Sequence, residues 1–167
     1  MKRKQYTKDN SILKDSSILK KTAWEGRCGM GKEPEAGSNE PKNAGLYIEP
    51  LDTLFSICKV TDYKGVDIEL PYVFTGSTDQ EKSLVCPVGA VPENTVRRDD
   101  GWKAFRIKGE LDFSLTGILA GIAKVLADSH IGIFAISTYN TDYVLTKEKD
   151  FCPALKALET AGYLVVD

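Results

Sequence analysis

The chain has 167 residues, 42% of them hydrophobic and 28% charged, which is the balance of a soluble globular protein with room for one domain or two very small ones. No stretch approaches the about 20 apolar residues of a membrane helix, and no apolar signal segment follows the N-terminus, so we expect a cytoplasmic protein with no membrane partner. Residues 1–45 carry 10 Lys and Arg against 6 Asp and Glu, but residues 46–167 carry 12 against 18, and this acidic body argues against nucleic acid as a partner.

Residues 1–45 are predicted to form a disordered or flexible tail, because they are rich in Lys, Ser, Gly, Glu and Asn and poor in large apolar residues. Within them, Gly26 to Lys32 has the G-x-x-x-x-G-K spacing of a phosphate loop. Glu33, however, stands where a magnesium-binding Ser or Thr is needed, and Pro34 follows it. We therefore expect a flexible glycine-rich segment here rather than a nucleotide site.

Residues 46–98 are predicted to fold mainly as strands with little helix. Apolar and polar residues alternate over 54–60, and short apolar runs follow at 72–74 and 84–86. The segment 78–81 has the spacing of a helix capping box, but little apolar sequence follows it that could build a helix.

Residues 99–167 give a clearer pattern, with two helices between strands. Phe105 and Ile107 alternate with charged residues in a strand over 103–108, and apolar residues recur at helical spacing over 114–128. Asp112 or Ser114 can cap that helix.

Two further strands are predicted at 131–136 and 143–145, and a second helix begins at Asp150, tolerates Pro153 in its first turn and stops near Gly162. A last strand covers 164–166. The resulting order β-α-β-β-α-β is that of a ferredoxin-like α+β unit.

Several segments resemble a family of small bacterial tandem-ACT proteins: GWKAFR at 101–106, LDFSLTGILA at 111–120 and IFAISTYNTDYVL at 133–145. Weaker echoes occur at 83–87 and 91–92. The same ACT type is similar to the regulatory domains of aspartate kinases and to the arginine sensors of the CASTOR group.

The resemblance implies a helix-poor N-terminal ACT-like unit at residues 46–98 and a C-terminal ACT domain at residues 99–167. It implies self-association, which we expect to give a homodimer. It also implies a ligand site at an ACT–ACT interface, built from the loop before the first helix and from the end of the second strand.

The loop before the first helix places polar groups and a glycine in the opening turn, where free backbone N–H groups can hold a carboxylate. The candidate ligand-binding residues here are Asp112, Phe113, Ser114, Leu115, Thr116 and Gly117. The alternative is a plain helix cap, with Gly117 present for packing between helix and sheet.

The end of the second strand and the turn after it supply the other candidates, which are Ile136, Ser137, Thr138, Tyr139 and Asp142. Asp142 could pair with an ammonium or guanidinium group, and Tyr139 could cover an aliphatic stem. The alternative is ordinary turn chemistry, since Asn140 and Asp142 are good turn formers.

No residue set indicates catalysis, a metal or another cofactor. The four cysteines are far apart in sequence, so we expect free buried thiols in a reducing cytoplasm. His130 is the only histidine, and the carboxylates Asp99, Asp100, Glu110 and Asp112 are predicted to lie scattered along a solvated edge.

We therefore expect a non-catalytic sensor that binds a free amino acid or a similar small metabolite and changes its contacts with an effector protein. Two alternatives stay open. One is a ligand-free protein-interaction module, and the other is a stand-alone regulatory relative of aspartate kinase.

Overall fold

The computed structural model describes residues 46–108 and 117–166, all within one compact unit of the chain. The tail predicted at residues 1–45 lies outside the described residues, as do the proposed helix caps Asp112 and Ser114. Among the described residues, the strands are β1 (Tyr47–Val60), β2 (Phe74–Ser77), β3 (Lys82–Pro87), β4 (Thr95–Lys108), β5 (Ile133–Ser137), β6 (Asp142–Lys147) and β7 (Leu164–Val165). The helices are α2 (Ile118–Asp128), α3 (Glu148–Thr160) and the short 3-10 helix η2 (Val88–Ala90).

The seven strands join in one mixed sheet with the order β2-β3-β1-β4-β6-β5, and β7 lies beside the start of β1. Every pair is antiparallel except β1 and β7, which run parallel. The order from β4 to β7 is β-α-β-β-α-β, so the predicted α+β, ferredoxin-like arrangement is confirmed. Between β1 and β4, where little helix was expected, only η2 is helical.

Three boundaries differ from the sequence pattern. β1 starts at Tyr47 because its first residues pair with both β4 and β7, which extends the strand well before the alternating part. β2 starts only at Phe74, since Tyr72 has a φ of +64° and occupies a turn after Pro71. α3 begins at Glu148, before Asp150, so Pro153 lies inside the helix, past its first turn, where the expected position in the first turn would have avoided the loss of a helical hydrogen bond.

The strand order of the sheet is symmetric about its middle. β2, β3 and β1 on one side occupy the positions of β5, β6 and β4 on the other. Hereafter the first half means residues 46–94 and the second half residues 95–166. The hairpins β2–β3 and β5–β6 also correspond in sequence, because Phe134, Ser137 and Thr138 lie 60 residues after Phe74, Ser77 and Thr78. The structure thus consists of two related halves joined through β1 and β4.

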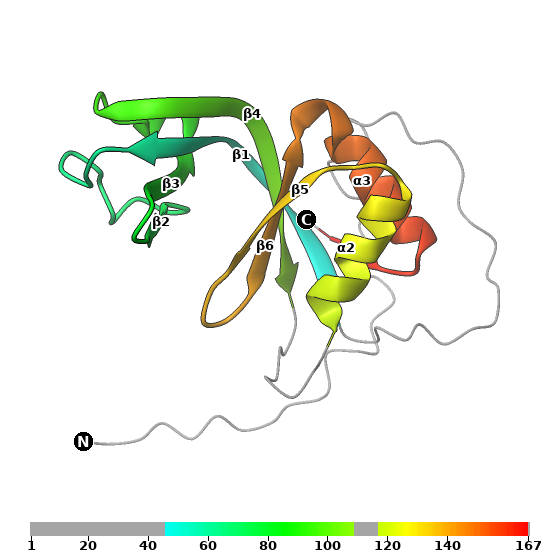
Figure 1. The fold of residues 1–167 in the computed structure, drawn as a ribbon. Helices are drawn as coiled ribbons and strands as arrows, with labels where there is room; N and C mark the ends of the chain where they lie inside the picture. The colour runs from blue at the N-terminus through cyan, green and yellow to red at the C-terminus, as the bar shows by residue number, and fades with distance from the viewer. Residues whose placement is uncertain (1–45, 109–116, 167) are drawn as a thin grey trace, which may run out of the picture. The chain divides into compact units, whose positions relative to one another are not determined.

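β1 and β4 bend together near their middle (Figure 1). Asp100 and Gly101 face the single residue Ser56 at a break in register, and Gly101 has a φ of +73°. The Ser56 hydroxyl donates to Asp100 Oδ1 at 2.5 Å and fixes this bulge. The boundary proposed between residues 98 and 99 falls within β4, next to this bend.

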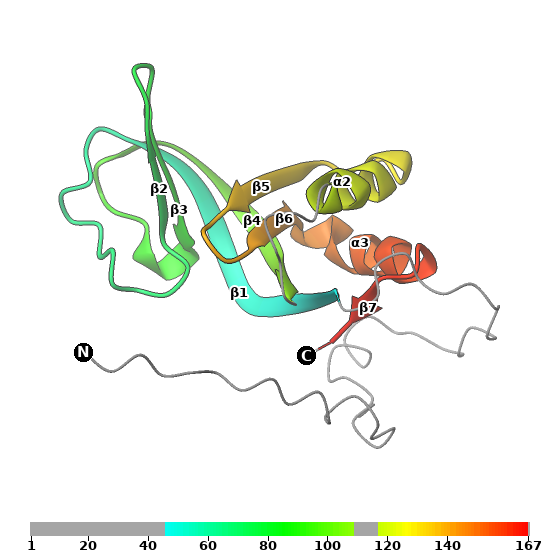
Figure 2. The ribbon, with the colours of Figure 1, turned by 90° about the horizontal axis from the view of Figure 1, so that it is seen from below.

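α2 and α3 cover one face of the sheet in the second half, called the helix face here (Figure 2). Strand alternation directs Phe105, Ile107 and Val144 to that face. The helices bury Ile122, Leu126, Phe151, Ala154, Leu155 and Leu158. Burial of these side chains is what fixes the helices on the sheet.

The opposite face, called the aromatic face here, carries a cluster drawn from both halves. Its buried members are Leu51, Phe55, Val85, Ala104 and Leu145. Half-buried Ile57, Tyr72, Phe74, Trp102, Phe134, Ile136 and Tyr143 pack against them.

The cysteines fit the expected pattern only in part. Cys58 and Cys86 are free and buried on neighbouring strands, and burial raises the pKa of the Cys86 thiol to about 11. Cys152 departs from the expectation because it is disulfide-bonded. Cys28 lies outside the described residues.

Candidate functional site

Gly117 is the residue from which α2 begins, and its φ of +84° lies in the left-handed region. A Cβ built there meets no atom of the described residues within 4 Å. The other candidates of this loop, Asp112, Phe113, Ser114, Leu115 and Thr116, lie outside the described residues.

The second group of candidates forms the tip of the β5–β6 hairpin. Ile136 and Ser137 end β5, Asp142 begins β6 opposite Ser137, and the turn lies between them. Thr138 closes that turn, since its N–H and its hydroxyl donate to the carbonyl of Thr141 at 2.9 and 2.7 Å. The Tyr139 side chain is 83% exposed.

Strand alternation divides these candidates between the two faces of the sheet. Ile136 and its neighbour across the hairpin, Tyr143, belong to the aromatic face. Ser137 and Asp142, one position further out, therefore project to the helix face, on the side of α2.

The hairpin tip and the start of α2 lie at the same end of the sheet (Figure 1). α2 and β5 run in opposite directions, so that the end of β5 returns toward the start of α2. The Thr141 hydroxyl donates to the carbonyl of Ile107, which ties the turn to the end of β4. Gly117, Ser137 and Asp142 are thus placed at one end and on one side of the sheet.

A charged cluster near this end was not foreseen from the sequence. The Arg106 guanidinium donates to Glu49, and Lys108 Nζ lies 3.3 Å from the same carboxylate. The hydrogen bond from Arg106 lowers the pKa of Glu49, and the same contact raises the pKa of Arg106 further above its already high value. Glu49 and Arg106 are 57 positions apart, so only the pairing of β1 with β4 reveals their contact.

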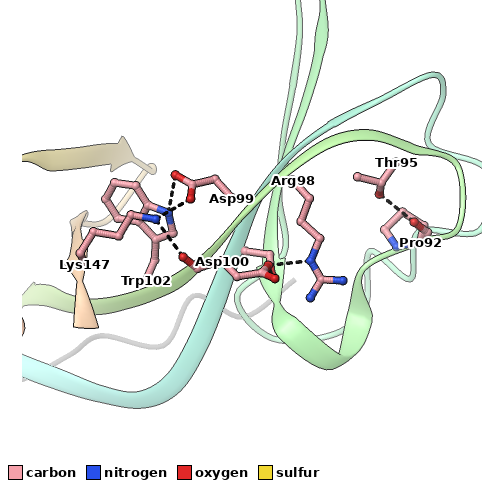
Figure 3. Close-up of polar contacts among 8 residues, drawn as sticks. Pro92, Thr95, Arg98, Asp99, Asp100, Trp102 and Lys147 are labelled. Atoms are coloured by element: carbon pink, nitrogen blue, oxygen red, sulfur yellow. Dashed lines mark hydrogen bonds and ion pairs between the residues drawn. The ribbon is translucent and has the colours of Figure 1, made fainter. Parts of the chain in front are cut away.

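Asp99 and Asp100 are exposed, as expected, and both also form polar contacts at the bend (Figure 3). Asp99 accepts from Lys147 Nζ at 2.5 Å and from Trp102 Nε1 at 3.2 Å, while Lys147 also lies 4.4 Å from the Trp102 ring centroid. Asp100 accepts from Arg98 Nε at 2.6 Å, which lowers the pKa of Asp100. These groups satisfy one another, so we assign them to the bend and not to a ligand site.

Within residues 46–108 and 117–166, no three His, Cys, Asp or Glu side chains gather in a way that could hold a metal ion. None of the helices in those ranges is both long enough and apolar enough to cross a bilayer.

Residues 97–160 match the ACT domain family. Among solved structures, the chain is similar to the protein Atu0741 of Agobacterium tumefaciens, with 27% identity and a TM-score of 0.66 over 73% of this chain and 92% of that chain. A Vibrio cholerae protein of unknown function, described as a possible transport protein, shares the fold with 17% identity and a TM-score of 0.55 over 70% of this chain and 90% of that chain.

The fold is also similar to that of the aspartate kinase of Clostridium acetobutylicum, an allosteric enzyme, with 13% identity and a TM-score of 0.54. The match covers 76% of this chain but only 36% of the kinase. No curated protein matches the sequence. The resemblance to ACT-type proteins that the sequence indicates is confirmed.

Proposed function

We propose that this chain, which carries an ACT domain at residues 97–160, is a non-catalytic regulatory protein that binds a free amino acid or a similar small metabolite. The observation that supports the proposal most is the placement of Gly117, Ser137 and Asp142 at one end of the sheet, inside the matched stretch. The site would lie between two ACT units, either the two halves of one chain or those of two chains.

The chemistry of these groups suits an amino acid. The first N–H groups of α2 have no partners within the helix and carry a positive partial charge, which favours a carboxylate. Gly117 carries no side chain that could block the approach to them, and no described atom lies within 4 Å of its Cβ position. Asp142, on the same side of the sheet, would meet the ammonium group.

The proposal requires that binding change an equilibrium between conformations or assemblies, because no reaction is involved. The aspartate kinase with a similar fold is an allosteric enzyme, which is consistent with a regulatory use of this fold. A stand-alone relative of such a regulatory domain would need an effector protein as partner. The alternative of a ligand-free interaction module has the same fold but an empty site.

Thermal unfolding in the presence of each of the twenty amino acids tests the proposal. A ligand present at about 100 times its Kd should add about 2.7 kcal/mol to the free energy of unfolding. Calorimetry with the amino acid that raises the melting temperature would then give its Kd and stoichiometry. If no amino acid raises the melting temperature, the interaction-module alternative is preferred.

Asp142→Asn tests the assigned site once that amino acid is known. Loss of the charged partner should weaken binding by about 1.5–3 kcal/mol, or roughly 10- to 150-fold. Asp79→Asn is the matched control, because Asp79 lies in the corresponding turn of the β2–β3 hairpin and should leave the Kd unchanged. Equal affinity in both folded variants would place the site elsewhere.

A further inference from the structure

Residues 61–73, called the strap here, join β1 to β2 and cover the first half on the face that α2 and α3 cover in the second half. Tyr63, Val66 and Val73 of the strap pack against the buried residues Cys58, Val60, Leu84 and Cys86. The Tyr63 hydroxyl donates to the carbonyl of Gly76 at 2.7 Å, which anchors the first part of the strap to β2.

The far end of the strap is held in an unfavourable backbone conformation. Tyr72 has a φ of +64° in the turn directly after Pro71. A positive φ after proline is typical of the third residue of a type II turn. Gly or Asn is the usual residue there, because a side chain raises the energy of the left-handed region. A tyrosine at this position needs compensating contacts.

Those contacts lie on the aromatic face and cross to the other half of the molecule. The Tyr72 ring packs edge-on against Phe55, with the centroids 6.2 Å apart, and against Tyr143, with the centroids 6.3 Å apart. Phe74, which follows the strap, lies 5.0 Å from the same Tyr143 ring. Tyr143 belongs to β6, so the end of the strap rests on the β5–β6 hairpin.

Tyr143 is itself firmly placed. It pairs with Ile136 across the hairpin and with Arg106 of β4, whose guanidinium donates to Glu49. Its chain neighbour Asp142 projects to the opposite face. Any displacement of the hairpin at Asp142 therefore displaces the Tyr143 ring as well.

We propose that Tyr72 is a latch, whose ring must rest on Tyr143 for the strap to keep its conformation. Displacement of the hairpin would remove the contact that offsets the strained backbone, and the strap would leave its turn. The strap presents Ile68 and Leu70, which are 67% and 41% exposed, so its release would change an apolar surface of the first half. The contact between Tyr72 and Tyr143 does not depend on a ligand. Only the idea that ligand binding at Asp142 would release the strap rests on the proposed function.

Hydrogen exchange of the full chain, measured by mass spectrometry without ligand, tests the latch. Tyr143→Leu keeps an apolar side chain on β6 but removes the ring. Exchange in residues 61–73 should become about tenfold faster, while exchange in α2 stays unchanged. Tyr143→Phe keeps the ring and loses only the hydroxyl, so it should leave the strap as in the wild type.

Phe134→Leu is the matched control, because Phe134 lies on the same aromatic face but its ring contact is with Trp102, at 6.4 Å. Exchange in the strap should not change in this variant. Equal acceleration by Phe134→Leu and Tyr143→Leu would mean general loosening of the aromatic face and would overturn the latch.

Tyr72→Ala tests the same contact from the strap and remains usable if Tyr143→Leu does not fold. The strap and the hairpin should affect each other equally, because coupling is reciprocal. In Tyr72→Ala, amide hydrogen exchange at the hairpin tip, where the Thr138 N–H donates to the carbonyl of Thr141, should therefore accelerate severalfold. Unchanged exchange at the tip in folded Tyr72→Ala would show that the strap and the hairpin are independent.

Discussion

At the residue scale, Tyr72 and Gly117 share a positive φ but differ in what that conformation costs. Gly117 has no Cβ, so the left-handed turn into α2 is unstrained. Any substitution there would strain the backbone, whether or not it also affected ligand binding. Tyr72 has a large side chain, and its conformation is maintained by ring contacts with Phe55 and Tyr143.

Replacing Tyr72 should therefore give an unusual order of stabilities. Tyr72→Gly and Tyr72→Ala both lose the ring contacts and should both be less stable than the wild type. The Gly variant should nevertheless be more stable than the Ala variant by about 1 kcal/mol, because Gly removes the left-handed strain. Urea unfolding measures the difference, and an Ala variant as stable as the Gly variant would contradict strain at this position.

The Glu49 ion pair should make stability depend on pH. Its carboxyl pKa is lowered from the ordinary 4.5 by the contact with Arg106, so the folded state binds this proton less readily than the unfolded state. The stabilisation is therefore complete above the ordinary pKa and is lost as the pH falls through the lowered value. At pH 7, Glu49→Gln should lower the free energy of unfolding by about 1 kcal/mol, and the difference from the wild type should vanish in strong acid.

Unfolding by urea at a series of pH values checks this expectation. Glu81→Gln serves as the control, because the Glu81 carboxylate pairs with Lys59 at 3.7 Å and both side chains are nearly half exposed. Such a pair contributes little to stability. A difference between wild type and Glu49→Gln that stays constant down to strong acid would show that the carboxylate charge is not what stabilises the pair.

At the element scale, the two hairpins are equivalent in sheet position but not in their surroundings. The tip of β5–β6 lies at the end of the sheet where α2 begins (Figure 1). Among the described residues no helix lies beside the β2–β3 hairpin, and the Tyr63 hydroxyl of the strap donates to its backbone at Gly76 and Ser83. The position of Asp142 is occupied there by Lys82.

This asymmetry predicts one ligand per chain rather than two. The first half lacks the helix start that would hold a carboxylate, and Lys82 would repel an ammonium group where Asp142 attracts one. Calorimetry of the amino acid identified by thermal shift should give a ratio of one per chain. A ratio of two would mean that both hairpins bind and that the strap does not fill the equivalent site.

At the scale of the whole molecule, β2 and β5 are the edges of the sheet, and no strand within residues 46–108 and 117–166 pairs with their outer sides. Unpaired edges favour association, so we predict a homodimer at micromolar concentration. Ala135 is exposed on β5, and a lysine there should hinder pairing along that edge. Light scattering should give a dimer mass for the wild type and a monomer mass for Ala135→Lys, whereas a monomeric wild type across a wide concentration range would contradict the prediction.

The sequence predicted the second half better than the first, and the reason is physical. The helices α2 and α3 bury one side each, so their apolar spacing is visible over many residues, and the order β-α-β-β-α-β follows from it. In the first half a loop takes the place of the helices, and a loop has no such period. The 60-residue correspondence between the hairpins is present in the sequence and could have identified the two related halves.

The candidate site could be predicted only in part from the sequence. Turn chemistry identified the hairpin tip, but the contact of Glu49 with Arg106 depends on the register of two strands far apart in the chain. The positive φ of Tyr72 could not be predicted from the sequence, because a tyrosine, unlike a glycine, does not indicate a left-handed turn. The division of Ile136 and Asp142 between two faces could be read from alternation only once the ends of β5 and β6 were known.

The place of β1 between β4 and β7 has a consequence for biosynthesis. Tyr47 and Ile48 pair with Leu164 and Val165, so the start of β1 is synthesised long before its partners in β7. During translation the first half can form its hairpin, but the start of β1 has no neighbour on either side until β4 and then β7 leave the ribosome. Such distant pairing slows folding and leaves strand edges exposed meanwhile. We therefore expect the nascent chain to complete this fold only after Leu164 and Val165 have been synthesised, and a stop codon before Leu164 to yield an aggregation-prone product.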